Sequence, residues 1–227
     1  MLSEKSFEKD TFKTSAGPLE ITFIGHGSLV LAFNGLVIHV DPVSEHADYS
    51  RLPRADLILV THEHSDHLDK KAIDLVRLPS TRIIYSKACE QTLPGGLVMK
   101  NGDHQVLMDI PVEAVPAYNL VHMRPDGRPF HPKGSGNGYI LTFGDHRVYI
   151  AGDTEDIPEM ESLPDIAIAF LPMNLPYTMT PEMVARAARQ FRPRILYPYH
   201  FGKTDLSELA RLLGEEKDIE IRIRRMP

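Results

Sequence analysis

Apolar residues recur near the start of the chain in runs of strand length, separated by short turns. Such runs cover Leu19–Ile24, Ser28–Phe33 and Leu36–Val40. The dipeptide Asn34-Gly35 lies between the last two runs, and Asn-Gly is a strong signal for a two-residue β-hairpin loop. The N-terminal third is therefore predicted to begin as an antiparallel meander.

Two later apolar runs are uninterrupted, which is typical of strands buried on both faces. They are Leu57–Val60 and Ile166–Leu171, and both fit the centre of a covered sheet. A second hairpin is predicted around Gly144-Asp145. Further strands are expected at Thr81–Tyr85, Tyr139–Phe143, Arg147–Ala151, Ile195–Tyr199 and Ile219–Ile223, with two or three more between Val98 and Pro116.

Three helices are predicted from capping residues that precede apolar residues at helical spacing. Asp69 is the expected cap of the first helix, which runs toward Leu78. Thr180 precedes the second helix, Pro181–Gln190, and proline suits the first helical position. Asp205 caps the third, Leu206–Leu213.

The order of these elements is similar in the two halves of the chain: strands come first, and strands mixed with helices follow. This order predicts an α/β protein with two sheets and with helices outside them. No shift in composition divides the chain, so we predict one domain over residues 19–227, preceded by a loose arm over residues 1–18. Residues 118–137 are polar and rich in Pro, Gly and His, which predicts a long functional loop.

Charge and cysteine content narrow the classes of function. The 227 residues include 25 Lys plus Arg and 31 Asp plus Glu, a formal charge of −6, so nucleic acid, which requires a basic face, is not the expected partner. The chain has one cysteine, Cys89, which excludes an internal disulfide and a zinc site built on cysteine pairs. Any transition-metal site must therefore use carboxylates and some of the 11 histidines.

The sequence also carries expectations about location. No apolar run approaches the roughly 20 residues of a membrane span, and the polar N-terminus lacks the apolar stretch of a secretory signal. We therefore expect a cytoplasmic protein without membrane contact. A homo-oligomer is compatible with the sequence but is not indicated by any pattern in it.

The histidines are concentrated between a predicted buried strand and a capped helix. His62, His64 and His67 lie within six residues together with Asp66, in the pattern H-x-H-x-D-H. In an extended segment alternate side chains point the same way, so His62 and His64 can converge on one ion. The chain then turns into the helix, which directs Asp66 and His67 differently. Two ligand pairs with different directions predict two adjacent metal ions rather than one.

This segment resembles the signature of the metallo-β-lactamase-fold superfamily. Similar motifs occur at Ile24–Ser28 and Val40–Pro42 upstream, and at Ala151–Thr154 and Pro198–Gly202 downstream. They follow in the order of the superfamily and extend over residues 19–203. The pattern is most similar to the branch that contains L-ascorbate-6-phosphate lactonase and related metal-dependent hydrolases. The resemblance implies an αββα sandwich of two mixed β-sheets flanked by helices, with metal ions at one edge of the sheets.

Two of the downstream motifs contain candidate metal ligands. Asp153 follows an apolar run and Gly152; a carboxylate there can bridge two cations, although Asp after Gly is also common in turns. His200 ends the strand predicted at Ile195–Tyr199, where a partly buried structural histidine is the alternative. The order of the motifs favours a metal ligand at both positions.

One further nitrogen ligand is expected, and two histidines of the long loop are candidates. The superfamily's usual position follows the strand near Pro111–Ala117, but this chain continues there with Tyr118 and Asn119. His131 lies in a loop constrained by Pro132 and Gly134, and the resembling branch carries such a motif. We therefore favour His131, and His122 remains the alternative.

The resemblance implies a dinuclear hydrolytic site. The first metal would be held by His62, His64 and His131; the second would be held by Asp66, His67 and His200, with Asp153 bridging. A metal-bound hydroxide would be the nucleophile, which Asp66 can orient, so Asp66 and Asp153 are the predicted catalytic residues. Nitrogen and oxygen ligands suit zinc first, and also manganese or iron.

Residues around this site are weaker candidates. Asp41 either holds the histidine loop by hydrogen bonds from behind the ligands or completes a turn at a strand end. His26 lies in a glycine-flanked turn and can face the mouth of the site, where it would contact substrate. A small anionic ester, lactone or phosphodiester is the expected substrate, and its candidate binding residues are Tyr118, Asn119, Lys133 and Tyr177.

Three other functions are compatible with the fold that the resemblance implies, because one fold hosts many reactions. The first is a nuclease or phosphodiesterase of the same superfamily, although no basic groove or RNA-gripping arm is evident. The second is an iron-dependent oxidoreductase, although no fused flavin or thiol-transfer domain is evident in these 227 residues. The third is a non-catalytic metal-binding module, which the complete predicted ligand set disfavours.

Overall fold

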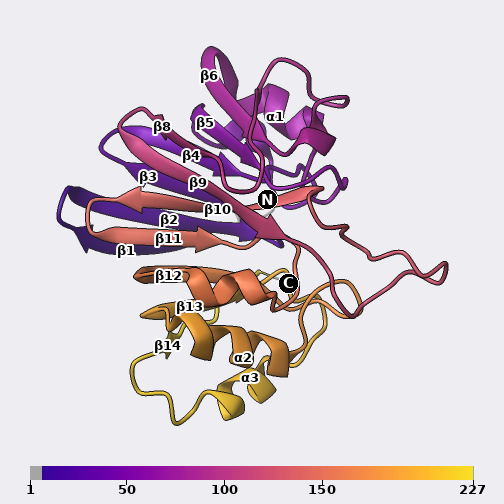
Figure 1. The fold of residues 1–227 in the computed structure, drawn as a ribbon. Coiled ribbons are helices and arrows are strands. Elements are labelled where there is room, and N and C mark those ends of the chain that lie inside the picture. Colours follow the sequence, from indigo (N-terminus) through magenta and orange to yellow (C-terminus); the bar gives the residue numbers. More distant parts are fainter. Residues whose placement is uncertain (1–6, 227) are drawn as a thin grey trace, which may run out of the picture.

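Two seven-stranded sheets pack face to face and carry helices on their outer faces (Figure 1). A computed structural model describes residues 7–226. The strands of the first sheet lie in the order of the chain: β1 Glu8–Thr14, β2 Gly17–Gly25, β3 Ser28–Phe33, β4 Leu36–Val40, β5 Ala55–Val60, β6 Arg77–Tyr85 and β7 Leu97–Val98.

The second sheet repeats this arrangement. Its strands, again adjacent in chain order, are β8 His104–Leu107, β9 Ile110–Ala117, β10 Gly136–Phe143, β11 His146–Ile150, β12 Ile166–Pro172, β13 Ile195–Tyr199 and β14 Glu220–Ile221. In each sheet the first four strands are antiparallel, and the remaining strands continue in parallel.

The helices begin where the sequence predicts them. They are α1 Lys70–Val76, α2 Pro181–Phe191 and α3 Leu206–Leu212, with short 3-10 helices at Tyr49–Arg51, Lys87–Cys89 and Pro158–Ser162. Asp69, Thr180 and Asp205 accept backbone N–H groups as the caps of α1, α2 and α3. None of the helices in residues 7–226 is long and apolar enough to cross a membrane.

Buried strands divide the apolar core into layers. Leu57 and Leu59 of β5 point into the core between the sheets, whereas Ile58 and Val60 pack on the other face, under α1. Phe170 of β12 likewise faces the core between the sheets, and the neighbouring residues of β12 pack against α2 and α3. These alternating contacts make four layers, so the prediction of an αββα sandwich is confirmed.

Several predicted boundaries differ from the observed ones. The first helix, expected to run toward Leu78, ends at Val76, because Arg77 already belongs to β6, where it pairs with Ala55 of β5. Residues 8–14, expected within a loose arm, form β1, because Phe12 packs into the core and the strand pairs along its whole length with β2; residues 1–6 of that arm lie outside the described residues. The final strand covers Glu220–Ile221 rather than Ile219–Ile223, because its ladder to β13 extends over two residue pairs.

Candidate metal centre

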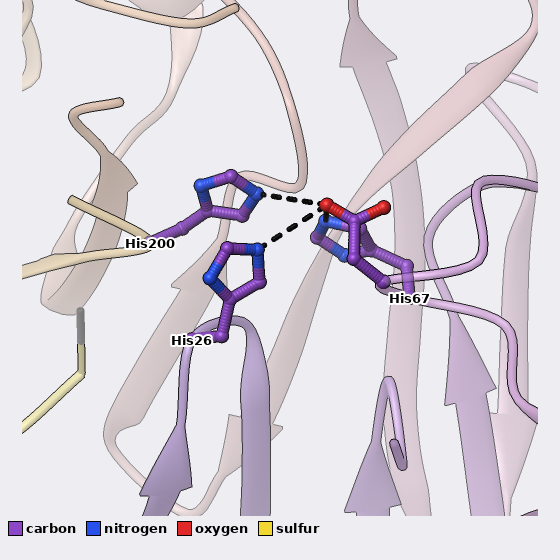
Figure 2. A group of neighbouring side chains, drawn as sticks. His26, His67 and His200 are labelled. Atoms are coloured by element: carbon purple, nitrogen blue, oxygen red, sulfur yellow. Dashed lines mark hydrogen bonds and ion pairs between the residues drawn. The ribbon is translucent and has the colours of Figure 1, made fainter. Parts of the chain in front are cut away.

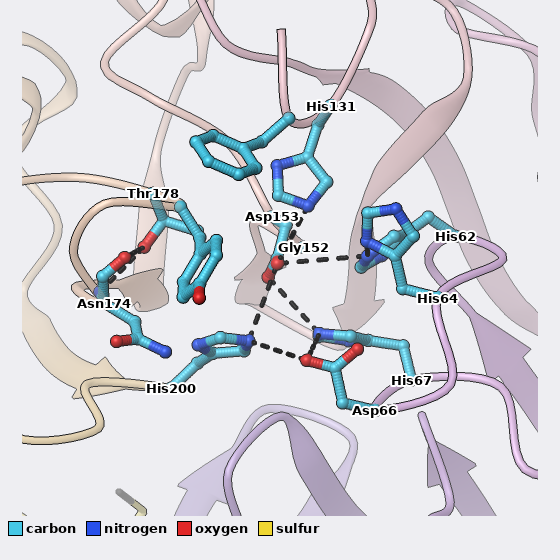
Figure 3. A network of polar contacts seen from close by, with 12 residues as sticks. His62, His64, Asp66, His67, His131, Gly152, Asp153, Asn174, Thr178 and His200 are labelled. Atoms are coloured by element: carbon cyan, nitrogen blue, oxygen red, sulfur yellow. Dashed lines mark hydrogen bonds and ion pairs between the residues drawn. The ribbon is translucent and has the colours of Figure 1, made fainter. Parts of the chain in front are cut away.

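The predicted ligands meet at one edge of the sandwich, at the carboxyl ends of strands from both sheets (Figure 3). β5 leads directly into the segment that carries His62 and His64, and α1 begins just beyond His67. β11 leads to Asp153 and β13 to His200. Strands buried on both faces therefore fix the backbone from which most of these side chains project.

The first group consists of His62, His64 and His131, each of which offers a nitrogen within 4.8 Å of the others. His62 Nε2 and His64 Nδ1 are 3.1 Å apart. The Thr61 hydroxyl donates its one proton to Asp41 Oδ2 at 2.7 Å, so it can only accept a hydrogen bond from His62 Nδ1, which lies 3.0 Å away. The proton of the neutral His62 ring is therefore on Nδ1, and Nε2 is free to act as a ligand.

The second group consists of His26, Asp66, His67 and His200, also within 4.8 Å. Figure 2 shows His26 and His200 directed at one carboxylate oxygen. Their Nε2 atoms lie 3.3 and 3.6 Å from Asp66 Oδ2. His67 Nε2 lies 3.9 Å from the same oxygen. The Asp66 side chain is 47% exposed, so it also reaches the solvent side of the site.

Asp153 lies between the two groups (Figure 3). Its Oδ2 is 3.1 Å from His131 Nε2, 3.5 Å from His200 Nε2 and 3.9 Å from His62 Nε2. Its Oδ1 is 3.4 Å from His67 Nε2. One buried carboxylate therefore contacts histidines of both groups, which is the position that a bridging ligand requires.

The chemistry of these groups fits bound cations. His67 Nε2, His200 Nε2 and Asp153 Oδ1 are buried and have no hydrogen-bond partner within residues 7–226, although buried polar atoms are usually partnered. Burial by itself lowers the pKa of His67, but the carboxylates of Asp153, Asp41 and Asp66 raise it to about 9. The cluster therefore favours positive charge where these atoms converge, and a divalent cation supplies it.

Asp41 supports the histidines from behind. Its Oδ2 accepts a hydrogen bond from His67 Nδ1 at 2.7 Å, and its Oδ1 accepts from the backbone N–H of Thr61 at 2.8 Å. The Asp41 side chain is fully buried, and its role in holding the loop follows from these contacts. Because Nδ1 of His67 is occupied, Nε2 is the nitrogen directed at Asp153.

Asn119 supports His131 in the same way. Its Oδ1 accepts hydrogen bonds from His131 Nδ1 at 2.7 Å and from the His131 backbone N–H at 2.8 Å. Its Nδ2 donates to Glu155 Oε1 at 3.0 Å and to the Tyr177 carbonyl at 2.9 Å. We expected Asn119 at the substrate; the structure instead buries it behind His131, because its amide is fully used in orienting that ring.

Glu155 holds the base of the long loop and was not identified from the sequence. Its carboxylate is buried and accepts the backbone N–H groups of Leu120, Val121 and His122 at 2.6–2.7 Å. His122 Nδ1 also lies 2.7 Å from Glu155 Oε1. His122 is therefore engaged away from both ligand groups, whereas His131 lies within the first.

A cavity of about 410 Å³ opens onto the two groups. Asp66, His131, Asp153 and His200 form its reactive wall. The rest of its lining comes from the segment between β5 and α1, the long loop and the segment after β12: His64, Ser65, Arg124, Phe130, Asn174 and Tyr177. A cavity of this volume suits a small molecule. Of the predicted substrate residues, Tyr177 lines the cavity and His26 lies in the second ligand group.

Tyr118 and Lys133 do not line this cavity. Lys133 Nζ pairs with Glu159 Oε1 at 2.7 Å, and the Tyr118 hydroxyl donates to Glu159 Oε2 at 2.9 Å. The glutamate therefore holds both side chains away from the ligands. Arg124, Phe130 and Asn174 line the cavity instead, and no pattern in the polar loop distinguishes Arg124 from the neighbouring basic residues.

Comparison with known proteins identifies the family. A family model described as the beta-lactamase superfamily domain matches residues 20–200. The chain belongs to the metallo-β-lactamase superfamily. A relative from Solibacter usitatus, named a UPF0173 metal-dependent hydrolase, is 31% identical and aligns over 91% of this chain and 93% of its own.

Two solved structures are similar to this chain over most of its length. A candidate metal-dependent hydrolase from Parabacteroides distasonis is 53% identical, with a TM-score of 0.94 over 98% of this chain and 100% of its own. A metallo hydrolase from Ignicoccus hospitalis is 21% identical, with a TM-score of 0.71 over 90% and 94% of the two chains. At that identity the second comparison shows the fold alone.

Within this metallo-β-lactamase fold, every residue predicted as a metal ligand reaches one of the two groups or the position between them. They are His62, His64, Asp66, His67, His131, Asp153 and His200. His26 joins them because its backbone carbonyl accepts the His200 N–H at 3.1 Å, which brings the two histidines side by side. The sequence indicated His26 for the site, but for its mouth rather than for the ligand group.

Proposed function

We propose that this protein is a metal-dependent hydrolase with two divalent metal ions. The observation that carries the proposal is the position of Asp153, whose two oxygens contact histidines of two separate ligand groups. The name metal-dependent hydrolase that the relative from Solibacter usitatus carries supports the same class of reaction.

Each ion has a defined set of proposed ligands. His62, His64 and His131 hold the first ion, and Asp66, His67 and His200 hold the second, with Asp153 shared. His26 is a further nitrogen within reach of the second group. Zinc is the first expectation for ligands that are nitrogen and oxygen atoms alone, and manganese and iron are the alternatives.

The chain's own residues prepare this site for hydrolysis. Bound divalent cations would lower the pKa of water toward about 7 and polarise a carbonyl or phosphoryl group. Asp66 is exposed toward the cavity, so it can orient the attacking water and accept its proton. Asp41 and Asn119 fix the rings of His67 and His131, which keeps the ligand nitrogens in place.

A small anionic ester, lactone or phosphodiester is the proposed substrate. The cavity of about 410 Å³ supports a small molecule rather than a polymer. The formal charge of −6 disfavours nucleic acid as the substrate. The branch that contains L-ascorbate-6-phosphate lactonase remains the proposed place of this chain within the superfamily, and a cytoplasmic location is proposed with it.

Metal content and hydrolysis test the proposal together. Elemental analysis of the native protein is expected to give two metal ions per chain, and a panel of anionic lactones, esters and phosphodiesters is expected to contain a substrate. One ion per chain would contradict the dinuclear site. Iron with no hydrolysis would favour an oxidoreductase, and two ions without any reaction would favour a non-catalytic module.

Two histidines of the same loop provide a matched pair of variants. His131→Ala is expected to lose the first ion, because it removes one of three ligands from that group. His122→Ala is the control, since His122 contacts Glu155 and neither ligand group. Unchanged metal content in His131→Ala would contradict the ligand assignment.

A further inference from the structure

Arg124 is a cation at the wall of the cavity without an acidic partner. It lines the same cavity as Asp153 and His200. Within residues 7–226 no carboxylate forms an ion pair with it, although Arg128 in the same loop pairs with Asp126 at 2.6 Å and Lys133 pairs with Glu159. A guanidinium left without a counter-ion beside a reactive site is suited to an anionic ligand.

Neighbouring residues hold Arg124 in this position. Arg124 lies in a short hairpin that is closed by the β-bridge between Met123 and Pro129. Within it the Arg124 backbone N–H donates to the Arg128 carbonyl at 2.7 Å. Arg124 Nη2 donates to the Phe130 carbonyl at 3.2 Å, and the guanidinium carbon lies 5.2 Å from the centre of the Phe130 ring. The hairpin therefore orients the guanidinium before any ligand binds, which reduces the entropic cost of binding.

His64 provides a second donor at the same place. Its Nδ1 faces His62 Nε2, and its Nε2 lies 3.5 Å from Arg124 Nη2. When Nδ1 holds the first ion of the proposed function, the proton of the neutral imidazole resides on Nε2. Arg124 and His64 then present two N–H groups that cannot bond to each other, and an oxygen that accepts from both satisfies them.

We propose that Arg124 and His64 form an oxyanion-binding subsite that holds a carboxylate or phosphoryl group of the substrate beside the first metal position. This proposal rests on the proposed hydrolase function and adds to it the residues that recognise the anion. It also replaces Lys133, which the sequence suggested for this role, because Glu159 already neutralises Lys133 outside the cavity. Asn174 and Tyr177 line the same cavity and can bind the uncharged part of the ligand.

Binding of a stable anion to the metal-loaded protein tests the subsite. Phenylphosphonate is titrated calorimetrically into the wild type and into Arg124→Gln, with acetohydroxamic acid, which chelates the metal but has no carboxylate or phosphonate group, as the comparison probe. Arg124→Gln is expected to weaken phenylphosphonate binding roughly 10- to 100-fold, the loss of a hydrogen bond to a charged group, and to leave acetohydroxamate binding and metal content unchanged. Arg124→Lys should lose less, because it keeps the charge but not the planar fork.

Two matched variants separate this subsite from general charge effects. Arg128→Gln removes a cation from the same hairpin, and Lys133→Gln removes the cation that the sequence favoured; both should bind phenylphosphonate as the wild type does. Repeating the titration with phenylacetate distinguishes a carboxylate from a phosphoryl group as the preferred anion, and either preference supports the subsite if it depends on Arg124.

The outcomes also separate this inference from the proposed function. Equal phenylphosphonate affinity in the wild type and Arg124→Gln, with acetohydroxamate still bound, would overturn the subsite and leave the hydrolase intact. A larger loss in Lys133→Gln than in Arg124→Gln would overturn it as well. Absence of bound metal and of acetohydroxamate binding in the wild type would overturn both.

Discussion

Several side chains of the site project from backbone conformations that residues other than glycine rarely adopt. The φ angles of His26, Asp41 and His200 are 55°, 42° and 47°. Such conformations cost of order 1–3 kcal/mol each and persist where surrounding contacts fix them. Here the contacts are the hydrogen bonds of Asp41 to Thr61 and the bond from His200 N–H to the His26 carbonyl. The strained positions thus coincide with the proposed metal centre, as is common at functional sites.

The backbone at Gly27 lies so close to the His67 ring that it leaves no room for a side chain. A Cβ atom at this position would lie 2.9 Å from Cε1 of His67 and 3.1 Å from its Nδ1. His67 is fully buried and bonded to Asp41, so the ring cannot move aside without losing that bond. Gly27→Ala is therefore expected to reduce the bound metal by up to one ion per chain, measured by elemental analysis after gel filtration.

Gly214→Ala is the control for this substitution. Gly214 follows α3, is exposed, and belongs to neither ligand group. We expect this variant to retain the metal content of the wild type. Equal metal content in Gly27→Ala and Gly214→Ala would show that the site accommodates the methyl group.

His39 should make the stability of the fold depend on pH. Its ring is buried within β4, and burial lowers its pKa to about 4, although the hydrogen bond from Nε2 to the Pro53 carbonyl opposes this shift. The unfolded chain has a pKa near 6.5 at this residue. Below that value the unfolded state binds the proton more readily, so stability falls as the pH drops from 6.5 toward 4.

Chemical denaturation at two pH values measures this effect. Between pH 7.5 and pH 5 the wild type is expected to lose about 2 kcal/mol more of unfolding free energy than His39→Gln, which cannot titrate there. The histidines of the metal centre are common to both proteins, so their titration cancels in the comparison. An equal loss in both proteins would mean that the buried ring is not the cause.

At the scale of whole elements, local chemistry explains which features the sequence revealed. Asn34 and Gly35 adopt φ angles of 49° and 83°, the left-handed turn that joins β3 to β4 and that these two residue types favour. Thr180 and Pro181 begin α2 for equally local reasons. The H-x-H-x-D-H segment was also recognisable, because its ligands are adjacent in the chain.

Features that depend on remote partners were not predictable in the same way. Phe12 is the one large apolar residue of β1, so its strand becomes evident from pairing with β2 rather than from its own pattern. Arg124 and Lys133 occur in the same polar loop, and Glu159, far along the chain, decides which of them is neutralised. The loop motif favours His131 over His122, but it does not reveal Glu155, which holds His122 away from the ligand groups.

Glu155→Gln tests whether the loop over residues 118–137 must be held in place for metal to bind. The buried Glu155 carboxylate organises the start of this loop. In Glu155→Gln the charge and part of the acceptor capacity for three backbone N–H groups are lost, and the Asn119 contact is weakened with them. We expect metal affinity to fall about 10- to 100-fold, the usual effect of losing support behind a ligand. Faster hydrogen exchange over residues 119–122 should accompany the loss.

Glu159→Gln is the comparison for that experiment. Glu159 binds Lys133 and Tyr118 in the same region but does not contact Asn119 or the loop backbone at residues 120–122. Its variant is expected to keep the wild-type metal affinity. Similar losses in the two variants would point to general weakening of the loop rather than to positioning of His131.

The whole molecule consists of two half-chains with the same order of strands. In each half four antiparallel strands are followed by parallel ones. The last antiparallel strand of the first half, β4, leads to Asp41, and that of the second half, β11, leads to Asp153. These two carboxylates contact opposite nitrogens of His67, at 2.7 and 3.4 Å. The residues that follow the corresponding strands of the two sheets thus meet at the imidazole ring of His67.

A second link between the halves lies at the chain ends. The carboxylate of Asp10 in β1 accepts two hydrogen bonds from Arg224 Nη2 at 2.7 Å and one from the Tyr197 hydroxyl of β13. Burial raises the pKa of Asp10, but the bonds from Arg224 and Tyr197 outweigh it and leave the pKa below its ordinary value. Asp10→Asn is expected to cost about 1–3 kcal/mol of unfolding free energy at pH 7.

The pH dependence of this effect follows from the lowered pKa. A carboxyl group with a lower pKa in the folded state stabilises the fold above its unfolded pKa, near 4, and the contribution disappears as the pH falls further. Denaturation of the wild type and Asp10→Asn should therefore differ at pH 7 and converge at acidic pH. Asp165→Asn, at an exposed position directly before β12, is the control.

Each proposed metal position draws its ligands from both half-chains: His62 and His64 need His131, and Asp66 and His67 need His200. Bound ions would therefore act as removable cross-links between the two sheets, and their binding free energy would add to the resistance of the fold to heat. The melting temperature should rise with metal concentration and fall with a chelator. A chain cut between β7 and β8 should then stay associated at lower protein concentration with the ions bound than without them, because the apolar core between the sheets also holds the halves together.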